Sequence, residues 1–204
     1  MGASPVQPLG IIVAGALFAA GAAEPQTHLD FIASSAAHAY AARAYEAIWV
    51  EHGGRIVAAL ERRTCMPFNE ENVSAVVADA ASHSGGPEHP MRLRASYDRD
   101  VKQSTLVHEL GHRHLWQLVE RLDDVDGHRT LYLVLDRVWA DVWGEAFAED
   151  RVQGESDWQS NYDYAAAWTW ARSLEPEERA RLWNRLLLMN GFPAGCDSSI
   201  DAAD

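Results

Sequence analysis

The pattern of apolar and polar positions predicts two helices in the first third of the chain. The first begins near Thr27, because Thr27 and Asp30 resemble a capping box, and it ends at the glycine pair Gly53–Gly54. Its many alanines indicate close helix packing. A second helix over the sequence GRIVAALERR ends before Pro67, because the residue that precedes a proline avoids the α region.

Between about residues 72 and 97 the pattern is typical of strands. The sequences VSAVVADA and MRLRASY are strand-like, and SHSGGPEHP between them has the glycine and proline signals of a loop. We therefore expect a small sheet in this region.

The chain becomes helical again beyond Asp100. Four helices are expected there, over residues 103–122, 129–152, 159–173 and 176–190. Pro176 fits the first turn of the last helix, and Gly191 fits its C-terminal end. These elements predict an α+β fold, mainly helical, with a small β-sheet packed on one of the helices.

Length and composition favour one globular domain over residues 1–204. Of the 204 residues, 48% are hydrophobic and 23% are charged, which is enough apolar material for one sizeable core. The formal net charge of −13 would repel a polyanion, so nucleic acid is not an expected partner.

The two ends of the chain differ from the rest. Residues 1–26 form an apolar segment that reads either as a buried strand or as a secretory signal, and residues 195–204 read as a loose acidic tail. Because the apolar segment has no positive N-terminal region, we expect a part of the fold and a cytoplasmic protein, or a secreted one if the segment is a signal. The run is also short and glycine-rich for a membrane span, so membrane association is not expected.

The cysteine content limits the kind of metal site that the chain can build. Only Cys65 and Cys196 occur, far apart and without a paired motif, so a thiolate zinc site is not indicated, although a single disulfide is possible. A metal site would need histidine and carboxylate ligands, for which nine histidines and thirty acidic residues are present.

The sequence TLVHELGHRHLWQL places His108, Glu109 and His112 in an apolar helix. His108 and His112 are four residues apart, so both imidazoles project from one helix face and can reach one cation. In such an H-E-x-x-H pattern the glutamate, here Glu109, is not a ligand but a general base for water. The alternative is that these are ordinary histidines and an ion-paired acid, but in an apolar helix each would then need its own partner.

A catalytic zinc site usually has three protein ligands, so a third must be found. The extension H-E-x-x-H-x-x-G-x-x-H is excluded, because Leu115 and Leu118 replace its glycine and its last histidine. A later helical sequence, VWADVWGEAFAEDRV, offers Glu145 among apolar neighbours. Asp141 and Glu149 lie four residues to either side and are the alternatives.

The HELGH sequence and the later GEAFAE sequence, in which Glu145 lies 33 residues after His112, resemble the gluzincin arrangement of zinc metallopeptidases, a branch of the zincin superfamily typified by thermolysin. The resemblance implies that His108, His112 and Glu145 bind Zn²⁺ and that Glu109 is the general base. It also implies that Glu149 is an outer-shell acid that orients the first histidine.

The second motif departs from the family pattern. Glu149 stands where the family more often has aspartate, and Gly144 stands where asparagine is common. The resemblance covers residues 105–152 only. What it implies is a zincin-like fold and a zinc-dependent peptidase with a peptide or protein substrate. In that family an extended substrate pairs with an edge strand, for which residues 91–97 are the expected segment.

Two points stay open from the sequence. The proton donor that such enzymes often use is not assigned, with four candidates in His128, Tyr132, Tyr162 and Tyr164. The alternative function is a non-catalytic zincin-like protein that uses zinc structurally or serves as a protein-interaction module.

Overall fold

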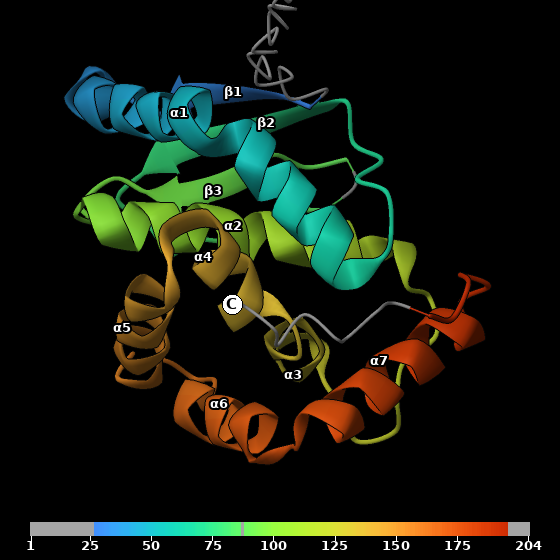
Figure 1. The fold of residues 1–204 in the computed structure, drawn as a ribbon. Coiled ribbons are helices and arrows are strands. Elements are labelled where there is room, and N and C mark those ends of the chain that lie inside the picture. Colours follow the sequence, from blue (N-terminus) through green and yellow to red (C-terminus); the bar gives the residue numbers. More distant parts are fainter. Residues whose placement is uncertain (1–26, 87, 196–204) are drawn as a thin grey trace, which may run out of the picture.

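Three parallel strands lie against two long helices in the computed structural model, which describes residues 27–86 and 88–195 (Figure 1). The strands are β1 (His28–Ala33), β2 (Asn72–Ala78) and β3 (Met91–Arg94), in the order β1-β2-β3. The apolar segment at residues 1–26 and nearly all of the predicted tail, residues 196–204, lie outside the described residues.

The first predicted helix is wrong at its start. Residues His28–Ala33 form β1, in which Leu29 is buried and Asp30 is exposed, and which pairs with β2 along its whole length. A period of two suits this half-buried strand, and pairing with β2 outweighs the local capping signal. Asp30 hydrogen-bonds to the ring of His28 at 2.9 Å instead of capping a helix.

The glycine pair does not end a helix. After a short 3₁₀ turn, η1 (Ala36–His38), a single helix α1 runs from Ala39 to Thr64 straight through Gly53. A Cβ atom on Gly53 would lie 2.9 Å from the ring of Trp49, so this glycine makes room for a tryptophan one turn earlier. The two predicted helices are therefore one, and its last residue precedes Pro67 as expected.

The strands follow the predicted pattern, whereas the next helix begins four residues before, and ends eight residues before, the predicted bounds 103–122. The two predicted strands are confirmed as β2 and β3. α2 (Arg99–His114) then begins with Asp98 as its N-cap, whose side chain accepts a hydrogen bond from the backbone N–H of Val101 at 2.9 Å. α2 packs on β3 and on α1, and its buried apolar residues Leu106, Val107 and Leu110 are fully enclosed. The 3₁₀ turn η2 (Leu115–Gln117) follows it.

Five shorter helices complete the described chain: α3 (Gly127–Tyr132), α4 (Leu135–Trp143), α5 (Glu145–Ser156), α6 (Tyr164–Ser173) and α7 (Pro176–Met189). The expected continuous helix over 129–152 is thus three helices. α4 ends at Gly144, whose φ of 92° is in a region that favours glycine, so the chain turns there before α5. In Figure 1, α5, α6 and α7 form an arc on the far side of α3 and α4 from the sheet.

One hydrophobic cluster connects these layers, from Leu29 in β1 to Leu187 in α7. Its largest fully buried side chains include Trp139, Trp168, Tyr45 and Tyr132. With Trp49 and Trp183, four of the eight tryptophans lie in the core. The α+β, mainly helical fold class is therefore confirmed, with the small sheet packed on α2.

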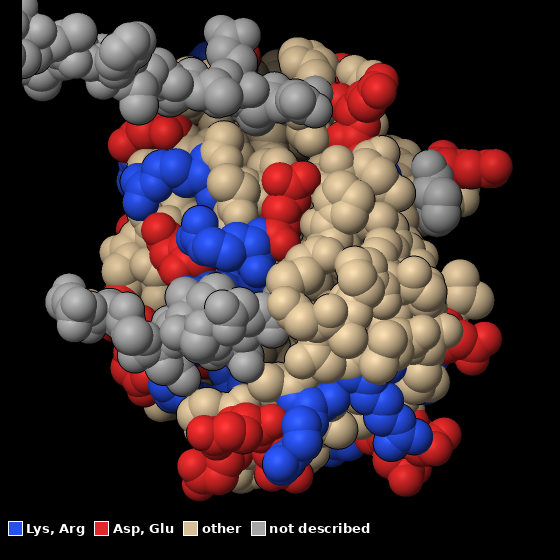
Figure 2. Space-filling view, turned by 45° about the vertical axis from the view of Figure 1, so that its right-hand side comes forward, with Lys and Arg blue, Asp and Glu red and all other residues tan. Residues whose placement is uncertain are grey.

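The surface has mixed charge. On the face in Figure 2, Lys and Arg side chains lie beside Asp and Glu side chains, and a broad area of uncharged residues lies between these mixed clusters. Among the described residues, no helix is both long enough and apolar enough to cross a lipid bilayer.

Candidate metal centre

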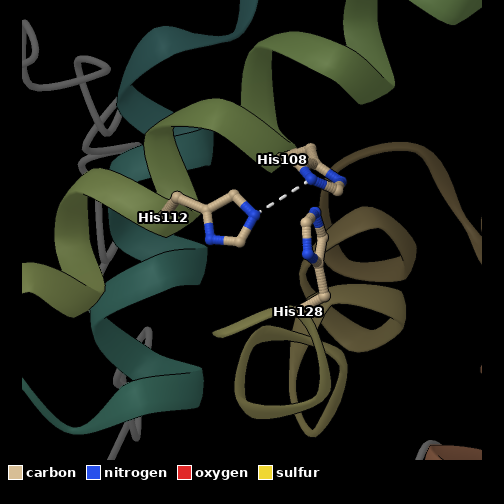
Figure 3. A group of neighbouring side chains, drawn as sticks. All are labelled: His108, His112 and His128. Carbon is tan, nitrogen blue, oxygen red and sulfur yellow. Dashed lines mark hydrogen bonds between the residues drawn. The ribbon is translucent and has the colours of Figure 1, made fainter. Parts of the chain in front are cut away.

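Three histidines meet where α2 faces α3. His108 and His112 project from α2, and His128 comes from the first turn of α3 (Figure 3). Each offers a ring nitrogen, and these three nitrogens all lie within 4.8 Å of one another. The structure thus brings together the two histidines of the HELGH sequence and adds a third that the sequence left among the possible proton donors.

The packing of α2 on α3 explains why His128 reaches this place. A Cβ atom on Gly111 would lie 2.6 Å from Cδ1 of Leu131, so α3 can approach α2 this closely only because residue 111 is glycine. Asp126 caps α3 by accepting a hydrogen bond from the N–H of Arg129 at 2.9 Å. It also accepts one from the hydroxyl of Tyr162 at 2.8 Å, and the Tyr162 ring stacks on His128.

A buried carboxylate orients the first histidine. Nδ1–H of His108 donates to Oε1 of Glu155 at 2.8 Å, and Oε2 of Glu155 accepts from the hydroxyl of Tyr132 at 2.8 Å and from Nε1–H of Trp168 at 3.1 Å. Glu155 is only 2% exposed. Because Nδ1 holds the proton, Nε2 of His108 presents its lone pair to His112 and His128, as in histidines that bind metals.

The spacing of the ring nitrogens fits a small cation. Nε2 of His108 lies 3.1 Å from Nε2 of His112. Two nitrogens that bind one tetrahedral zinc at 2.0–2.1 Å are about 3.3 Å apart, so this pair needs little adjustment. Neutral imidazoles suit Zn²⁺ as well as copper, nickel and iron ions.

The protonation of the three rings is unequal. Burial alone would lower the pKa of His108, but the adjacent Glu155 carboxylate and, to a smaller extent, Glu109 raise it above the ordinary value. Burial lowers the pKa of His112 well below its usual range, with further contributions from His108 and His128. Burial and the charge of His108 lower the pKa of His128 to about 4. Near neutral pH, His112 and His128 are therefore uncharged and able to bind a metal.

Glu109 lies beside this cluster and has no partner of its own in the described part of the chain. Its side chain is buried, with 7% exposed, and no hydrogen bond or ion pair reaches its carboxylate from residues 27–86 or 88–195. Burial raises the pKa of Glu109 to about 7, against the lowering effect of His108.

The structure places Glu145 away from the histidines, which corrects its assignment as the third ligand. Its side chain is 78% exposed and lies 3.5 Å from Arg137. Glu145 is ten residues before Glu155 on α5, or about 15 Å along the helix axis, and Glu155 is the residue that contacts His108. Residue 145 is therefore outside the group that could hold a metal, of which His128 is the third member.

Glu149 and Asp141 are also elsewhere. Glu149 accepts a hydrogen bond from Arg172 at 3.0 Å, and the acid that contacts His108 is Glu155 instead. Asp141 pairs with Arg62 and Arg63. The acidic residues expected to face one cation are instead each paired with arginine, because the turn at Gly144 separates α4 from α5.

Aromatic residues surround the histidines. The four proton-donor candidates have different surroundings. His128 belongs to the group of three histidines, the hydroxyl of Tyr132 donates to Glu155, and the hydroxyl of Tyr162 donates to Asp126. Tyr164 differs, because its hydroxyl has no hydrogen bond among the described residues. The centroid of its ring lies 5.1 Å from the centroid of the His128 ring. Burial raises the pKa of Tyr164 to about 12, so its hydroxyl keeps its proton at neutral pH.

The predicted substrate edge is partly occupied. Arg92 in the middle of β3 exchanges both backbone hydrogen bonds with His83, at 2.8 and 2.9 Å. The loop around His83 therefore covers the outer edge of β3 at this residue, and an extended peptide cannot pair with Arg92 as the structure stands.

Sequence reasoning missed the roles of His128 and Glu155. For His128, the sequence DGH offers a partial signal, since Asp126 is a good N-cap and predicts that His128 lies in the first turn of a helix. For Glu155 no sequence signal is available, because its burial results from packing between α5 and α6.

Because comparisons with known proteins found no match, a function has to be assigned from the chemistry of these side chains. No protein-family model, no curated protein and no solved structure matches this chain.

Proposed function

We propose that the protein is a zinc-dependent peptidase whose metal is held by His108, His112 and His128. The observation that carries this proposal is that three imidazoles converge next to a buried glutamate, Glu109, which has no partner among the described residues. Three protein ligands are typical of a catalytic zinc, which keeps one position for water or substrate, whereas structural zinc sites usually have four.

The metal would supply a Lewis acid that polarises the scissile carbonyl and makes water more acidic. Glu109 accepts the proton of the attacking water and transfers it to the leaving amine, as a general base and then a general acid. Its lack of any other partner in the described chain leaves both carboxylate oxygens available for that transfer.

Tyr164 is the residue that we assign as a hydrogen-bond donor to the developing oxyanion. Its protonated hydroxyl has no partner among the described residues, and the centroids of its ring and the His128 ring are 5.1 Å apart. A fixed donor in a site with little water stabilises negative charge that forms during the reaction.

Glu155 is a positioning residue in this scheme. It fixes the tautomer of His108, and the two hydrogen bonds from Tyr132 and Trp168 hold its carboxylate in place. Such outer carboxylates typically change metal affinity or activity by about 10- to 100-fold when they are replaced.

The decisive test compares wild-type protein with the Glu109→Gln variant. Both are expected to bind one zinc per chain by elemental analysis, and only the wild type is expected to cleave a peptide mixture, with cleavage abolished by chelator and restored by zinc. Glu149→Gln, which alters an exposed acid of α5, is the matched control and should stay active.

Other outcomes contradict the proposal in different ways. Absence of stoichiometric metal would eliminate the metal centre itself. Zinc that raises thermal stability in a protein that cleaves no peptide would instead indicate a structural clasp. Full activity in Glu109→Gln would remove the general-base role.

A further inference from the structure

A small cavity adjoins the metal group at His112. It has a volume of about 160 Å³, and its lining residues come from α2, η2, α3 and two loops: Ser84, His112, Leu115, Trp116, Arg121, Gly127 and Thr130. Cavities for whole small-molecule ligands are usually about 300–1,000 Å³. A cavity of this size next to a catalytic metal suits one side chain of a longer substrate.

The lining is mostly uncharged. Leu115 and Trp116 provide an apolar wall, and Ser84 and Thr130 add small polar groups. Among the described residues that line the cavity, only Arg121 has a permanent charge. A bound side chain would therefore contact apolar surface along its stem and a guanidinium at its end.

Arg121 has no acidic partner in the part of the chain that the structure describes. Its Nη1 donates to the carbonyl oxygen of Leu118, and no carboxylate among those residues lies within 4.0 Å of its guanidinium. Other arginines of this acidic protein are paired: Arg113 with Glu70, Arg172 with Glu149 and Arg179 with Asp136. The guanidinium of Arg121 therefore has hydrogen-bond donors that are available to a ligand.

We propose that this cavity selects an acidic side chain of the peptide substrate, aspartate or glutamate, at a fixed position next to the scissile bond, with Arg121 as the specificity-determining residue. The inference rests on the proposed peptidase function and adds its substrate class. A carboxylate can form a bidentate, charge-assisted pair with a guanidinium.

Competing side chains fit this cavity less well. A lysine or arginine side chain would place like charge against Arg121, and an apolar side chain would leave the guanidinium partly desolvated without a partner. The net charge of −13 disfavours acidic substrates at long range, so the preference has to arise from this local contact.

The test is digestion of a synthetic peptide library, randomised at every position, by zinc-loaded full-length protein, with cleavage sites read by mass spectrometry. Wild type should show aspartate or glutamate enriched at one position relative to the cleaved bond. For a matching acidic peptide, Arg121→Gln should lower kcat/KM by roughly 10- to 100-fold, while cleavage of a neutral peptide changes little.

Three further variants separate specificity from structure. Arg121→Lys should retain part of the acidic preference, and Arg121→Glu should shift the preference towards lysine and arginine. Arg185→Gln is the matched control, since Arg185 is an exposed arginine of α7 that does not line the cavity.

Cleavage by wild type without acidic preference, or an unchanged preference in Arg121→Gln and Arg121→Glu, would overturn this inference and leave the peptidase proposal standing. A library in which no peptide is cleaved would overturn the peptidase proposal, and the inference with it.

Discussion

Nδ1 of His108 lies 2.8 Å from Oε1 of Glu155, which is 47 residues away in the chain. Both side chains are buried, and the same carboxylate accepts hydrogen bonds from Tyr132 and Trp168. This contact sets the direction in which Nε2, the other ring nitrogen of His108, can bind a metal ion.

Replacing that carboxylate should weaken the metal site without removing a ligand. We expect Glu155→Gln to lower zinc affinity by about 10- to 100-fold, because an amide no longer fixes the histidine tautomer by charge. A competition titration against a zinc-binding dye measures the change. Unchanged affinity would show that His108 is oriented by its packing alone.

The identity of the third ligand can be tested with a pair of variants. We expect His128→Ala to lower zinc affinity by roughly 100-fold or more, because it removes an imidazole from the group. Glu145→Gln should bind zinc like the wild type, since its exposed side chain lies beside Arg137. The same titration applied to both variants decides the question, and the opposite result would restore the gluzincin ligand set.

Tyr164→Phe tests the proposed donor. Loss of one preorganised donor to an oxyanion typically costs about 100- to 1,000-fold in kcat. We expect a fall of that order with little change in KM or zinc content. Tyr40→Phe, at a tyrosine of α1 that is 79% exposed, should have no effect. Equal activity in both variants would exclude a catalytic hydroxyl at residue 164.

Gly111 and Gly127 provide a matched pair for the packing of α2 on α3. A Cβ atom at residue 111 would overlap buried Leu131, so Gly111→Ala should lower the free energy of unfolding by about 1–3 kcal/mol and also weaken zinc binding. At Gly127 nothing lies within 4 Å, so Gly127→Ala should be neutral or stabilising by up to about 1 kcal/mol. Urea unfolding with chelator present measures both.

His114 should make stability depend on pH. It is buried between Phe68, on which its ring stacks, and Thr64, whose hydroxyl lies 2.7 Å from Nε2. Burial lowers the pKa of His114 from 6.5 to about 4, so between these values the unfolded chain binds a proton that the folded chain does not.

The free energy of unfolding should therefore fall as pH decreases from about 6.5 to about 4, by up to about 3 kcal/mol from this residue, and stay level below that. Urea unfolding across this range, with chelator present, should show a shallower pH slope in His114→Gln than in the wild type. Parallel slopes would mean that His114 is protonated in the folded protein.

The parts of the fold that could be predicted are those in which the local pattern and the packing agree. β2, β3 and α7 have clear signals at both ends, and α2 has an aspartate N-cap and a long apolar face. β1 and Gly53 could not be predicted, because pairing with β2 and contact with Trp49 decide their structure.

At the site, the HELGH spacing alone places His108 and His112 together, since both belong to one helix. The third member of the histidine group depends instead on how separate helices pack. The turn at Gly144 moves Glu145 towards Arg137, and Gly111 admits α3 with His128. Spacing along the chain contains no information on either event.

The carboxylate of Glu155 joins side chains from α2, α3, α5 and α6 at one point. The five-residue HELGH motif is therefore not sufficient by itself to orient its first histidine in this protein. A fragment that ends before α5 would keep all three histidines and Glu109 yet lose the anion that aligns the first of them. Shortening the chain from its C-terminal side should thus weaken metal binding before any of the three histidines is deleted.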